Sequence, residues 1–410
     1  MKLLIVAMPD SIHTARWISQ VSDMGWEIHL FSSNTSGVTS SDLRSVTVHH
    51  LFQIGNSDVD QSVQVKGISL FSDFAVFCLS KIIERFFPSI FAHRLAKLIK
   101  KVNPDIVHSL EMQHAGYLTL DTRKKYNDIF PPWIVTNWGS DIYLFGRLAA
   151  HSEKIKEVLA LADFYSCECQ RDVCLAKAYG FSGRVLPVFP NAGGFDLAYM
   201  SELQQKGFAS ERRVIMLKGY QSWAGRALVA LRALERSSDM LKGYTVTIYS
   251  ATPDVEIAAE LFQHTTGIPV VLVSKETTHL EIMRWHGRAR VSIGLSISDA
   301  ISTSMLEAMV MGAFPIQSWT ACADEWIEEG VNGLLVPPED PEIVEKALRR
   351  VLSDDDLVNR AAKHNFELAI ERLDHGLLRK MTADLYTTVA EERHMLTRFA
   401  KKGKLRETTS

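Results

Sequence analysis

The segment Asp299–Met309 reads DAISTSMLEAM, and it decides the fold and the class of function expected for this chain. It follows a strand-like run at 289–296 and opens a short apolar helix pattern that ends at Gly312. The predicted order is therefore strand, polar loop and helix start. The first N–H groups of a helix have no intrahelical partner and lie at the positive end of the helix dipole, so this position suits a phosphate or another anion.

Two carboxylates bracket the predicted anion site. Asp299 lies on the loop, and Glu307 lies eight positions later, within the first turns of the helix. Both carboxylates can therefore face one ligand from different sides. A capping box is the alternative, because Ser304 with Glu307 three residues later is also the pattern in which an acid only satisfies the helix's own N–H groups. The organisation of the rest of the chain favours a ligand site.

Size and composition indicate a soluble globular protein of two or three domains. The chain has 410 residues, of which 46% are hydrophobic and 23% are charged, and its formal net charge is −3. Nothing in this balance indicates nucleic-acid binding. The five cysteines are few and odd in number, which is typical of a reducing, cytoplasmic setting. No stretch reaches the roughly 18 uncharged apolar residues that a membrane-spanning helix needs.

Strand-like and helix-like runs alternate through most of the chain, as in parallel α/β sheets. A strand-like run at 3–8 is followed by a helix pattern that Ser11 can cap and by another strand at 26–31. The cluster PNAGG at 190–194 is the best candidate domain boundary, and a strand-like run at 213–218 begins the same scheme again. We therefore expect an α/β fold with two sheets whose carboxyl edges face a central cleft.

The segment 67–102, which follows an expected polar loop at 53–66, departs from this alternation. It combines aromatic and basic residues, namely Phe71, Phe74, Phe77, Phe86, Phe87 and Phe91 with Lys81, Arg85, Arg94, Lys97, Lys100 and Lys101. Such interleaving is typical of a helix that lies on an anionic membrane surface, and it raises the possibility of peripheral contact at the inner face of a membrane. Burial of the apolar side chains under a solvated basic face explains the same pattern, and we favour that interpretation.

Three motifs of the second half resemble the donor-binding domain of the retaining GT-B glycosyltransferases of family four, also called glycosyl transferases group 1. They are the acid-x7-acid motif from Asp299 to Glu307, the turn and strand MGAFPI at 311–316, and EGVNGLLVPP at 329–338. The first half resembles the same family more loosely. Its matching segments are NPDIVH at 103–108, Gly-Ser-Asp at 139–141 and PNAG at 190–193. The resemblance covers most of the chain.

The resemblance implies a GT-B architecture of two Rossmann-like domains. Residues 1–192 would form the N-terminal acceptor-side domain and residues 193–375 the nucleotide-sugar donor domain. Residues 376–410 would form a C-terminal helix, able to pack back on the N-terminal domain, and a basic tail. The implied activity is the metal-independent transfer of a sugar, with retention of configuration, from a nucleotide-diphosphate sugar to a glycan or lipid-linked acceptor.

The finer expectations are a UDP-sugar as donor, no cofactor besides that co-substrate, and a role in surface polysaccharide synthesis. Two alternatives remain open. One is a nucleotide-sugar epimerase of the same fold, and the other is a degenerate, non-catalytic subunit that binds a donor or partner. Acceptor-dependent release of a nucleoside diphosphate separates both from a transferase.

The resemblance also assigns residues to the donor. Glu307 would hold the ribose hydroxyls, and Asp299 would contact the transferred sugar. The backbone N–H groups of Ser302, Thr303 and Ser304 would face the donor. Val273 and Ser274 end a strand at the place where the family's backbone meets the nucleobase.

Two cations are assigned to the diphosphate. The family places an Arg after the first strand of the second domain and a Lys about five residues later, and this chain offers Lys218 and Arg226 in swapped order at a longer spacing. Fixed positive charge there would stabilise the leaving diphosphate more than the ground state. A solvated surface charge is the alternative for each residue. The run Asp354–Asp356 matches the letters of a metal-binding acid pair, but we interpret it as a turn and expect no metal site.

The acceptor-side assignments are His13 and Asp141. His13 lies where the family has a Gly-rich acceptor loop, which this chain lacks, and an ordinary first-turn residue is the alternative. Asp141 belongs to the Gly-Ser-Asp loop at the carboxyl edge of the sheet. Asn137 and Trp138 stand where many relatives have a His, so a contact with the donor sugar is altered or missing.

Overall fold

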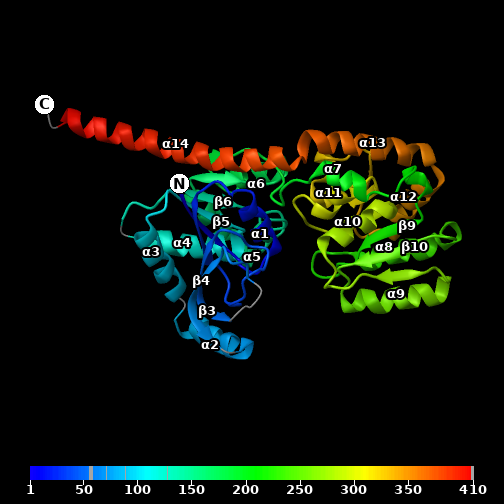
Figure 1. The fold of residues 1–410 in the computed structure, drawn as a ribbon, viewed down its shortest axis with the longest axis horizontal. Helices are drawn as coiled ribbons and strands as arrows, with labels where there is room; N and C mark the ends of the chain where they lie inside the picture. The colour runs from blue at the N-terminus through cyan, green and yellow to red at the C-terminus, as the bar shows by residue number, and fades with distance from the viewer. Residues whose placement is uncertain (55–58, 71, 88, 127, 408–410) are drawn as a thin grey trace. The chain divides into compact units, whose positions relative to one another are not determined.

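The computed structural model describes residues 1–54, 59–70, 72–87, 89–126 and 128–407. The chain divides into two compact units, each with its own parallel sheet (Figure 1). Unit 1 comprises Met1–Gly193 and Gly376–Ser410, and unit 2 comprises Gly194–His375. The chain therefore leaves unit 1 within the Pro/Asn/Gly cluster and returns to it at the start of its last helix.

Unit 1 is built on an eight-stranded sheet in the order β4-β3-β2-β1-β5-β6-β7-β8. Its strands, all paired in parallel, are β1 (Lys2–Ala7), β2 (Glu27–Ser32), β3 (Thr47–Ile54), β4 (Gln64–Leu70), β5 (Ile106–Leu110), β6 (Trp133–Thr136), β7 (Phe164–Ser166) and β8 (Arg184–Val185). Its helices are α1 (Ile12–Ser19), α2 (Asp73–Phe86), α3 (Ile90–Val102), α4 (Tyr117–Lys125), α5 (Ala149–Leu161) and α6 (Gln170–Ala178). The strand order reverses between β1 and β5, and sheets of this kind bind ligands at the carboxyl ends of the strands beside such a point.

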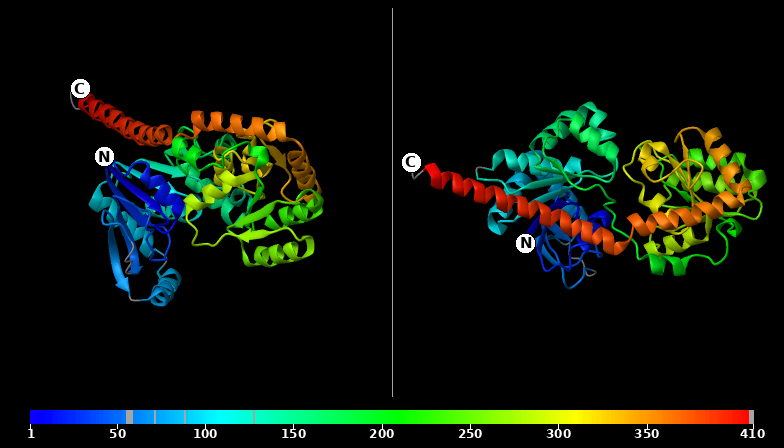
Figure 2. Two further views of the ribbon diagram at one scale, coloured as in Figure 1. Left: turned by 45° about the vertical axis from the view of Figure 1, so that its right-hand side comes forward. Right: turned by 90° about the horizontal axis from the view of Figure 1, so that it is seen from above.

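The first strand and helix follow directly from their sequence. Leu3 to Ala7 of β1 are fully buried, as expected for a parallel strand that helices cover on both faces (Figure 2). The Ser11 side chain caps α1 by accepting the N–H of His13 at 3.2 Å, so the predicted cap is confirmed. The expected loop at 53–66 is wrong at both ends, because β3 continues to Ile54 and β4 begins at Gln64. β4 is an edge strand with mostly exposed side chains, so it lacks an apolar pattern.

The buried-core interpretation of the segment 67–102 is correct for one helix and wrong for the other. α3 packs as expected, with buried residues Ala92, Leu95, Ile99 and Val102. On α2, in contrast, Phe74, Phe77 and Phe86 are 76%, 59% and 71% exposed. Phe71 lies outside the described residues. The structure thus leaves an aromatic surface on unit 1 that the core does not explain.

The last helix, α14 (His375–Glu407), belongs to unit 1 from Gly376 onward. It is tied to the sheet by a fully buried network, in which the Tyr386 hydroxyl accepts the indole N–H of Trp17 at 2.8 Å and lies 2.8 Å from Nδ1 of His108. The other His108 nitrogen, Nε2, lies 2.7 Å from the hydroxyl of Thr136. The helix continues to Glu407, and the side chains of the basic tail at 394–410 lie outside those described.

Unit 2 is built on a six-stranded parallel sheet in the order β11-β10-β9-β12-β13-β14. Its strands are β9 (Val214–Lys218), β10 (Thr245–Tyr249), β11 (Val270–Leu272), β12 (Ala289–Gly294), β13 (Phe314–Ser318) and β14 (Leu334–Val336). Its helices are α7 (Leu197–Leu203), α8 (Ala227–Arg236), α9 (Pro253–Thr266), α10 (His279–Arg288), α11 (Thr303–Val310), α12 (Pro341–Ser353) and α13 (Asp355–Arg372). Here the strand order reverses between β9 and β12, which makes their carboxyl ends the expected ligand side.

Two apolar clusters hold the unit 2 sheet between its helices. One unites the sheet with α8, α9 and α12, and the other joins Met216 of β9 and Ala289 of β12 to Ala308 of α11. Among the described residues, no helix combines the length and the apolar character that crossing a bilayer requires.

Candidate functional site

The carboxyl ends of β9 and β12 are covered by the loop 219–226, which follows β9. Its backbone is fixed against the segment after β12, since the Arg226 N–H donates to the Leu295 carbonyl at 3.0 Å and the Ile297 N–H donates to the Ala224 carbonyl at 2.9 Å. The loop is thus held in place by main-chain hydrogen bonds at the point where the strand order reverses.

Helix α11 begins at Thr303, four residues before Glu307. Ser302 is the N-cap residue, and its side chain makes no capping hydrogen bond but lies 2.9 Å from the Ser304 hydroxyl. A capping box built on Ser304 requires Glu307 at the third helical position, whereas it is the fifth. That alternative is therefore wrong.

The Glu307 carboxylate is instead held by a neighbouring helix. Oε1 of Glu307 lies 2.6 Å from Nε2 of His279, the first residue of α10. The Glu307 side chain is 7% exposed and the His279 side chain is 44% exposed. A buried carboxylate with a partner of this kind keeps a fixed orientation.

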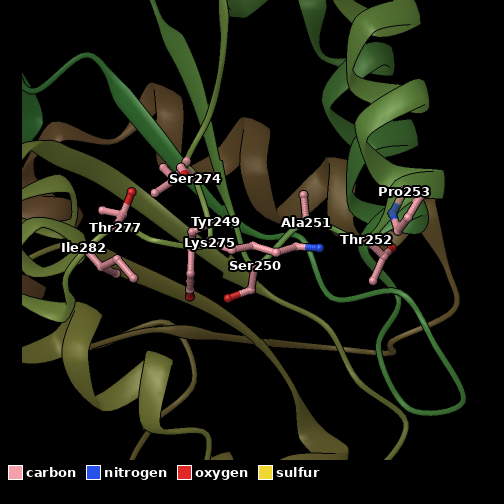
Figure 3. Close-up of a pocket in the computed structure, with 10 residues that line it drawn as sticks. Tyr249, Ser250, Ala251, Thr252, Pro253, Ser274, Lys275, Thr277 and Ile282 are labelled. Atoms are coloured by element: carbon pink, nitrogen blue, oxygen red, sulfur yellow. The ribbon is translucent and has the colours of Figure 1, made fainter. Parts of the chain in front are cut away.

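A hollow of about 320 Å³ opens at the carboxyl ends of β10 and β11 (Figure 3). Tyr249, Ser250, Ala251, Thr252, Pro253, Val273, Ser274, Lys275, Thr277 and Ile282 line it. The Tyr249 hydroxyl is hydrogen-bonded to the Ser304 side chain, so the hollow adjoins the first turn of α11. Val273 and Ser274, the two residues assigned to the nucleobase, lie in its wall.

The charge of Glu307 acts on two buried rings that contact each other at 5.5 Å between centroids, those of Tyr249 and His286. Burial, together with that negative charge, raises the pKa of Tyr249. Burial lowers the pKa of His286 to about 4, although Glu307 opposes the shift. Both rings are therefore neutral at physiological pH.

The two predicted diphosphate cations have different surroundings. Lys218 is half-buried at the end of β9, where it pairs in register with Tyr249, and no described residue bonds its ammonium group. Arg226 donates from Nε to Glu339 at 2.9 Å, and its Nη1 lies near four loop carbonyls, the closest being that of Gly225 at 2.9 Å. The Arg226 guanidinium therefore holds the loop 219–226 together through hydrogen bonds. This geometry gives no support to the diphosphate role predicted for Arg226.

The other acids of unit 2 that the sequence singled out are Asp299 and those of the run 354–356, and they contact residues close to them. Oδ1 of Asp299 accepts the N–H of Ala300 at 2.9 Å on the loop before α11. Asp354 caps α13 by accepting the Leu357 N–H at 2.8 Å, and Asp355 lies 2.7 Å from Arg290. The run expected to be a turn is therefore a helix cap, Asp354, followed by the first two residues of α13.

In unit 1 the acceptor-side residues gather at the carboxyl ends of β1, β5 and β6. The rings of His13 and Trp138 lie 5.6 Å apart, which places the turn after β1 beside the loop after β6. Asp141 is buried, and its Oδ2 accepts the N–H groups of Met112 at 2.9 Å and Trp138 at 2.8 Å. Asp141 thus joins the loops after β5 and β6.

The Asn137 side chain takes part in a buried network. Its side chain is fully buried and donates to Asp172 at 2.8 Å, while its oxygen accepts the Tyr165 hydroxyl. Arg171 donates from Nε to the other oxygen of Asp172 at 2.9 Å. This network lies within the domain, whereas the ring of the neighbouring Trp138 contacts that of His13.

Glu111, which directly follows β5, is a site residue that sequence analysis missed. Its φ of 82° and ψ of 159° fall in a region almost restricted to glycine. The buried carboxylate accepts the N–H groups of His114 and Ala115 and lies 3.3 Å from Nδ1 of His114, whose pKa it raises. Burial and the Glu111 charge raise the pKa of Asp141. Its place at the carboxyl end of a central strand is the signal that would have found it.

Two family models match the chain, one in each half. Glycosyl transferase 4-like matches residues 2–164, and Glycosyl transferases group 1 matches residues 214–354. The chain belongs to the group 1 glycosyltransferases. No curated protein matches this glycosyltransferase at a significant level.

Solved structures of glycosyltransferases share its whole fold at low identity. Sucrose-phosphate synthase from Thermosynechococcus elongatus is 14% identical with a TM-score of 0.69, covering 95% of this chain and 99% of its own. Anabaena HepE in complex with UDP-glucose is 14% identical with a TM-score of 0.67, covering 95% and 100%. Trehalose 6-phosphate synthase from Burkholderia multivorans is 14% identical with a TM-score of 0.66, covering 96% and 98%. The predicted α/β class and GT-B architecture of two Rossmann-like domains are confirmed.

Proposed function

We propose that this glycosyltransferase transfers a sugar from a nucleotide-diphosphate sugar, with retention of configuration and without a metal ion. The observation that carries the proposal is the buried Glu307 carboxylate, which His279 holds at 2.6 Å beside the hollow at the ends of β10 and β11. A fixed, charged acceptor of hydrogen bonds suits a pair of ribose hydroxyls. The complex of the similar HepE structure with UDP-glucose supports a UDP-sugar as the donor.

The donor would lie across the carboxyl edge of the unit 2 sheet. Its base would meet the backbone of Val273 and Ser274, and its transferred sugar would contact Asp299. The diphosphate would face the N–H groups of Ser302, Thr303 and Ser304, where the dipole of α11 favours an anion. Val273 and Ser274 lie in the wall of the hollow, and the Tyr249 hydroxyl in the same wall is hydrogen-bonded to Ser304.

The proposed transfer is a same-face attack. The acceptor oxygen bonds to the anomeric carbon as the bond from that carbon to the diphosphate oxygen breaks, and the leaving diphosphate takes the proton of the acceptor hydroxyl. Negative charge therefore grows on the diphosphate. Lys218 and the first turn of α11 would stabilise it, because positive charge that is fixed in advance favours the transition state over the ground state.

The acceptor would bind at unit 1, at the edge where His13, Glu111, His114, Trp138 and Asp141 gather. The hydrogen-bonding imidazole, indole and carboxylate groups of these side chains suit the hydroxyls of a glycan or a lipid-linked glycan, and surface polysaccharide synthesis is the pathway that we propose. None of the five cysteines, all of which lie among the described residues, forms a disulfide, which supports the reducing, cytoplasmic setting that we propose.

A non-catalytic, donor-binding subunit is the second candidate, and the engaged guanidinium of Arg226 favours it, since only Lys218 is then left for the diphosphate. Calorimetric titration with UDP, GDP, ADP and their common sugars tests donor binding. An assay of acceptor-dependent nucleoside diphosphate release then separates the candidates. Binding without release for any glycan or lipid-linked acceptor would favour the subunit, and conversion of the donor without an acceptor would favour an epimerase.

A further inference from the structure

A pocket of about 260 Å³ opens in unit 2 between the end of α7, the segment 207–212 and α13. We call it the Arg212 pocket. Arg212 lies two positions before β9, and its side chain reaches Ala289, the first residue of β12. The pocket therefore lies at the amino edge of the sheet, whereas the candidate donor site lies at the carboxyl edge. Figure 1 shows α7 and α13, the two helices that border the pocket.

The Arg212 guanidinium is a buried cation without a carboxylate partner among the described residues. Arg212 is 3% exposed, and its guanidinium donates to the carbonyl oxygens of Ala289 and Met311 and to the amide oxygen of Gln204. Burial lowers the pKa of Arg212 to about 10, so the group remains charged at physiological pH. A buried charge without a counter-ion is unfavourable, and a bound anion would remove that penalty.

One edge of this guanidinium is not used by the fold. Both N–H groups of Nη1 are engaged, since Nη1 lies 2.9 Å from the Met311 carbonyl oxygen and 3.3 Å from that of Ala289. On the other edge, Nε has no hydrogen-bond partner among the described residues, and Nη2 lies 3.4 Å from Oε1 of Gln204. Because Gln204 and Arg212 both line the pocket, this edge borders it. Nε and Nη2 together form the fork that binds two oxygens of a carboxylate or a phosphate at once.

A structural role explains only part of this arrangement. Met311 follows the last residue of α11, so Nη1 of Arg212 holds the end of that helix, where a cation also suits the negative end of the dipole. Gln204 supports the same helix end by donating from Nε2 to the Val310 carbonyl at 3.1 Å. These contacts need Nη1 and an amide, and they leave Nε without a partner. A ligand accounts for the unused edge.

The other residues around the pocket also suit a small organic anion. None of the described residues that line it is acidic, and Lys363 of α13 adds an exposed cation. The contact of Lys363 with Glu367 is an exposed pair at 3.9 Å, which contributes little. The carboxylate of Glu211, the residue before Arg212, is engaged by the Phe208 N–H at 3.0 Å. The rings of Phe208 and Phe366 add apolar surface to the lining.

We propose that Arg212 and Lys363 bind a small oxyanion, a phosphate monoester or a carboxylate, whose organic part contacts Phe208 and Phe366. Two oxygens of the anion accept the N–H groups of Nε and Nη2 of Arg212, and one of them replaces the Gln204 oxygen at Nη2. The volume of the pocket lies just below the range of about 300–1,000 Å³ that larger ligands occupy, so it suits a small molecule. The site does not depend on the proposed sugar transfer, and its test measures no activity.

Calorimetric titration of the full chain with phenyl phosphate and with benzoate tests the proposal. We expect saturable binding of at least one of the two anions, and a higher midpoint of thermal unfolding in its presence, because the anion binds the folded chain. Tighter binding of phenyl phosphate would identify a phosphate monoester as the ligand, and tighter binding of benzoate a carboxylate. Benzyl alcohol, which has a ring but no charge, should not bind. Equal binding of benzyl alcohol, or saturable binding of neither anion, would overturn the proposal.

Variants locate the binding. Arg212→Lys keeps the charge but has no fork, so it should weaken anion binding about tenfold or more. Lys363→Gln removes an exposed cation without disturbing the core and should weaken binding about threefold. Two control variants should leave the affinity unchanged: Lys242→Gln removes an exposed cation elsewhere in unit 2, and Lys218→Ala removes the cation of the candidate donor site.

Two outcomes of the variants would contradict the proposal. Loss of anion binding in Lys218→Ala, with full binding in Arg212→Lys and Lys363→Gln, would place the anion at the carboxyl edge of the sheet. A lower thermal unfolding midpoint in Arg212→Lys with unchanged anion affinity would make Arg212 a purely structural residue.

Discussion

Nε2 of His279 lies 2.6 Å from Oε1 of Glu307, so the first residue of α10 holds the buried acid of α11. The two residues stand 28 positions apart in the sequence and on different helices. Glu307 does not cap its own helix, so its carboxylate is a buried acid that His279 orients for another purpose. Donor binding is the purpose that the neighbouring hollow supports.

Glu307→Gln should weaken donor binding about tenfold or more, because hydrogen bonds to a charged group contribute about 1.5–3 kcal/mol. The thermal unfolding midpoint should change little, since no helix cap is lost. Titration of the UDP-sugar that binds the unchanged protein, with thermal unfolding alongside, measures both effects. Glu281→Gln on α10, whose acid pairs with Arg284 at 3.0 Å, is the control and should leave affinity unchanged. A variant that loses stability but keeps donor affinity would make Glu307 structural.

Lys218→Ala and Arg226→Ala should have opposite profiles. Removing a fixed cation from the diphosphate costs about 10²-fold or more in turnover, so Lys218→Ala should lower kcat without lowering stability. Arg226→Ala should instead lower stability, by about 1–2 kcal/mol, because loop carbonyls and Glu339 lose their donor. Steady-state kinetics and urea unfolding of both variants separate the roles. Near-normal turnover of Lys218→Ala would remove it from the site.

The fold was largely predictable because its signals are local. The apolar runs of β1 and β12, the cap at Ser11 and the turn at Gly312 each depend on neighbouring residues, and all four are found as expected. The edge strand β4 was missed because its exposed side chains carry no apolar alternation. The exposure of α2 was also missed, since a sequence pattern shows that a helix has an apolar face but not whether the domain covers it.

Parts of the site depend on contacts between distant segments, which no local pattern encodes. The spacing of Asp299 and Glu307 was visible, but the partner of Glu307 was not, because any of many polar residues could have met it. Arg226 was assigned by its charge, and only the structure shows that its guanidinium is taken up by Glu339 and its own loop. Glu111 carries a backbone conformation that its residue type does not suggest.

His286 should make unit 2 less stable in mild acid. Burial lowers its folded pKa to about 4, against about 6.5 for an unfolded histidine. Below pH 6.5 the unfolded chain binds a proton that the folded chain refuses, so the stability present above that pH is lost as the pH falls toward 4, by roughly 1.4 kcal/mol per pH unit. Neither ring nitrogen has a hydrogen-bond partner among the described residues.

His286→Phe removes this titration while keeping a ring against Tyr249. Differential scanning calorimetry from pH 7.5 to 5 should show a flatter dependence of the unit 2 transition on pH in the variant. His264→Phe, on the exposed surface of α9, is the control and should leave the dependence unchanged. An identical slope in His286→Phe and the unchanged protein would place the acid sensitivity elsewhere.

Tyr386→Phe should detach α14 from unit 1 in part. The Tyr386 hydroxyl accepts the Trp17 indole N–H and lies 2.8 Å from Nδ1 of His108, whose pKa burial lowers to about 3. Nδ1 of a neutral His108 accepts a hydrogen bond from the Tyr386 hydroxyl, and Nε2 donates one to Thr136. The chain of hydrogen bonds is therefore complete only with the tyrosine hydroxyl. Its loss leaves two buried polar groups without partners.

The expected cost of Tyr386→Phe is about 2–6 kcal/mol, since each of the two buried groups left unpaired costs about 1–3 kcal/mol. Urea unfolding measures it, and hydrogen exchange along α14 should show faster opening of that helix. Tyr199→Phe removes the hydroxyl of a residue that is 41% exposed on α7, and it should change stability by no more than about 0.5 kcal/mol. Equal, small effects of the two substitutions would mean that apolar packing, and not the buried hydrogen bonds, holds α14 to the sheet.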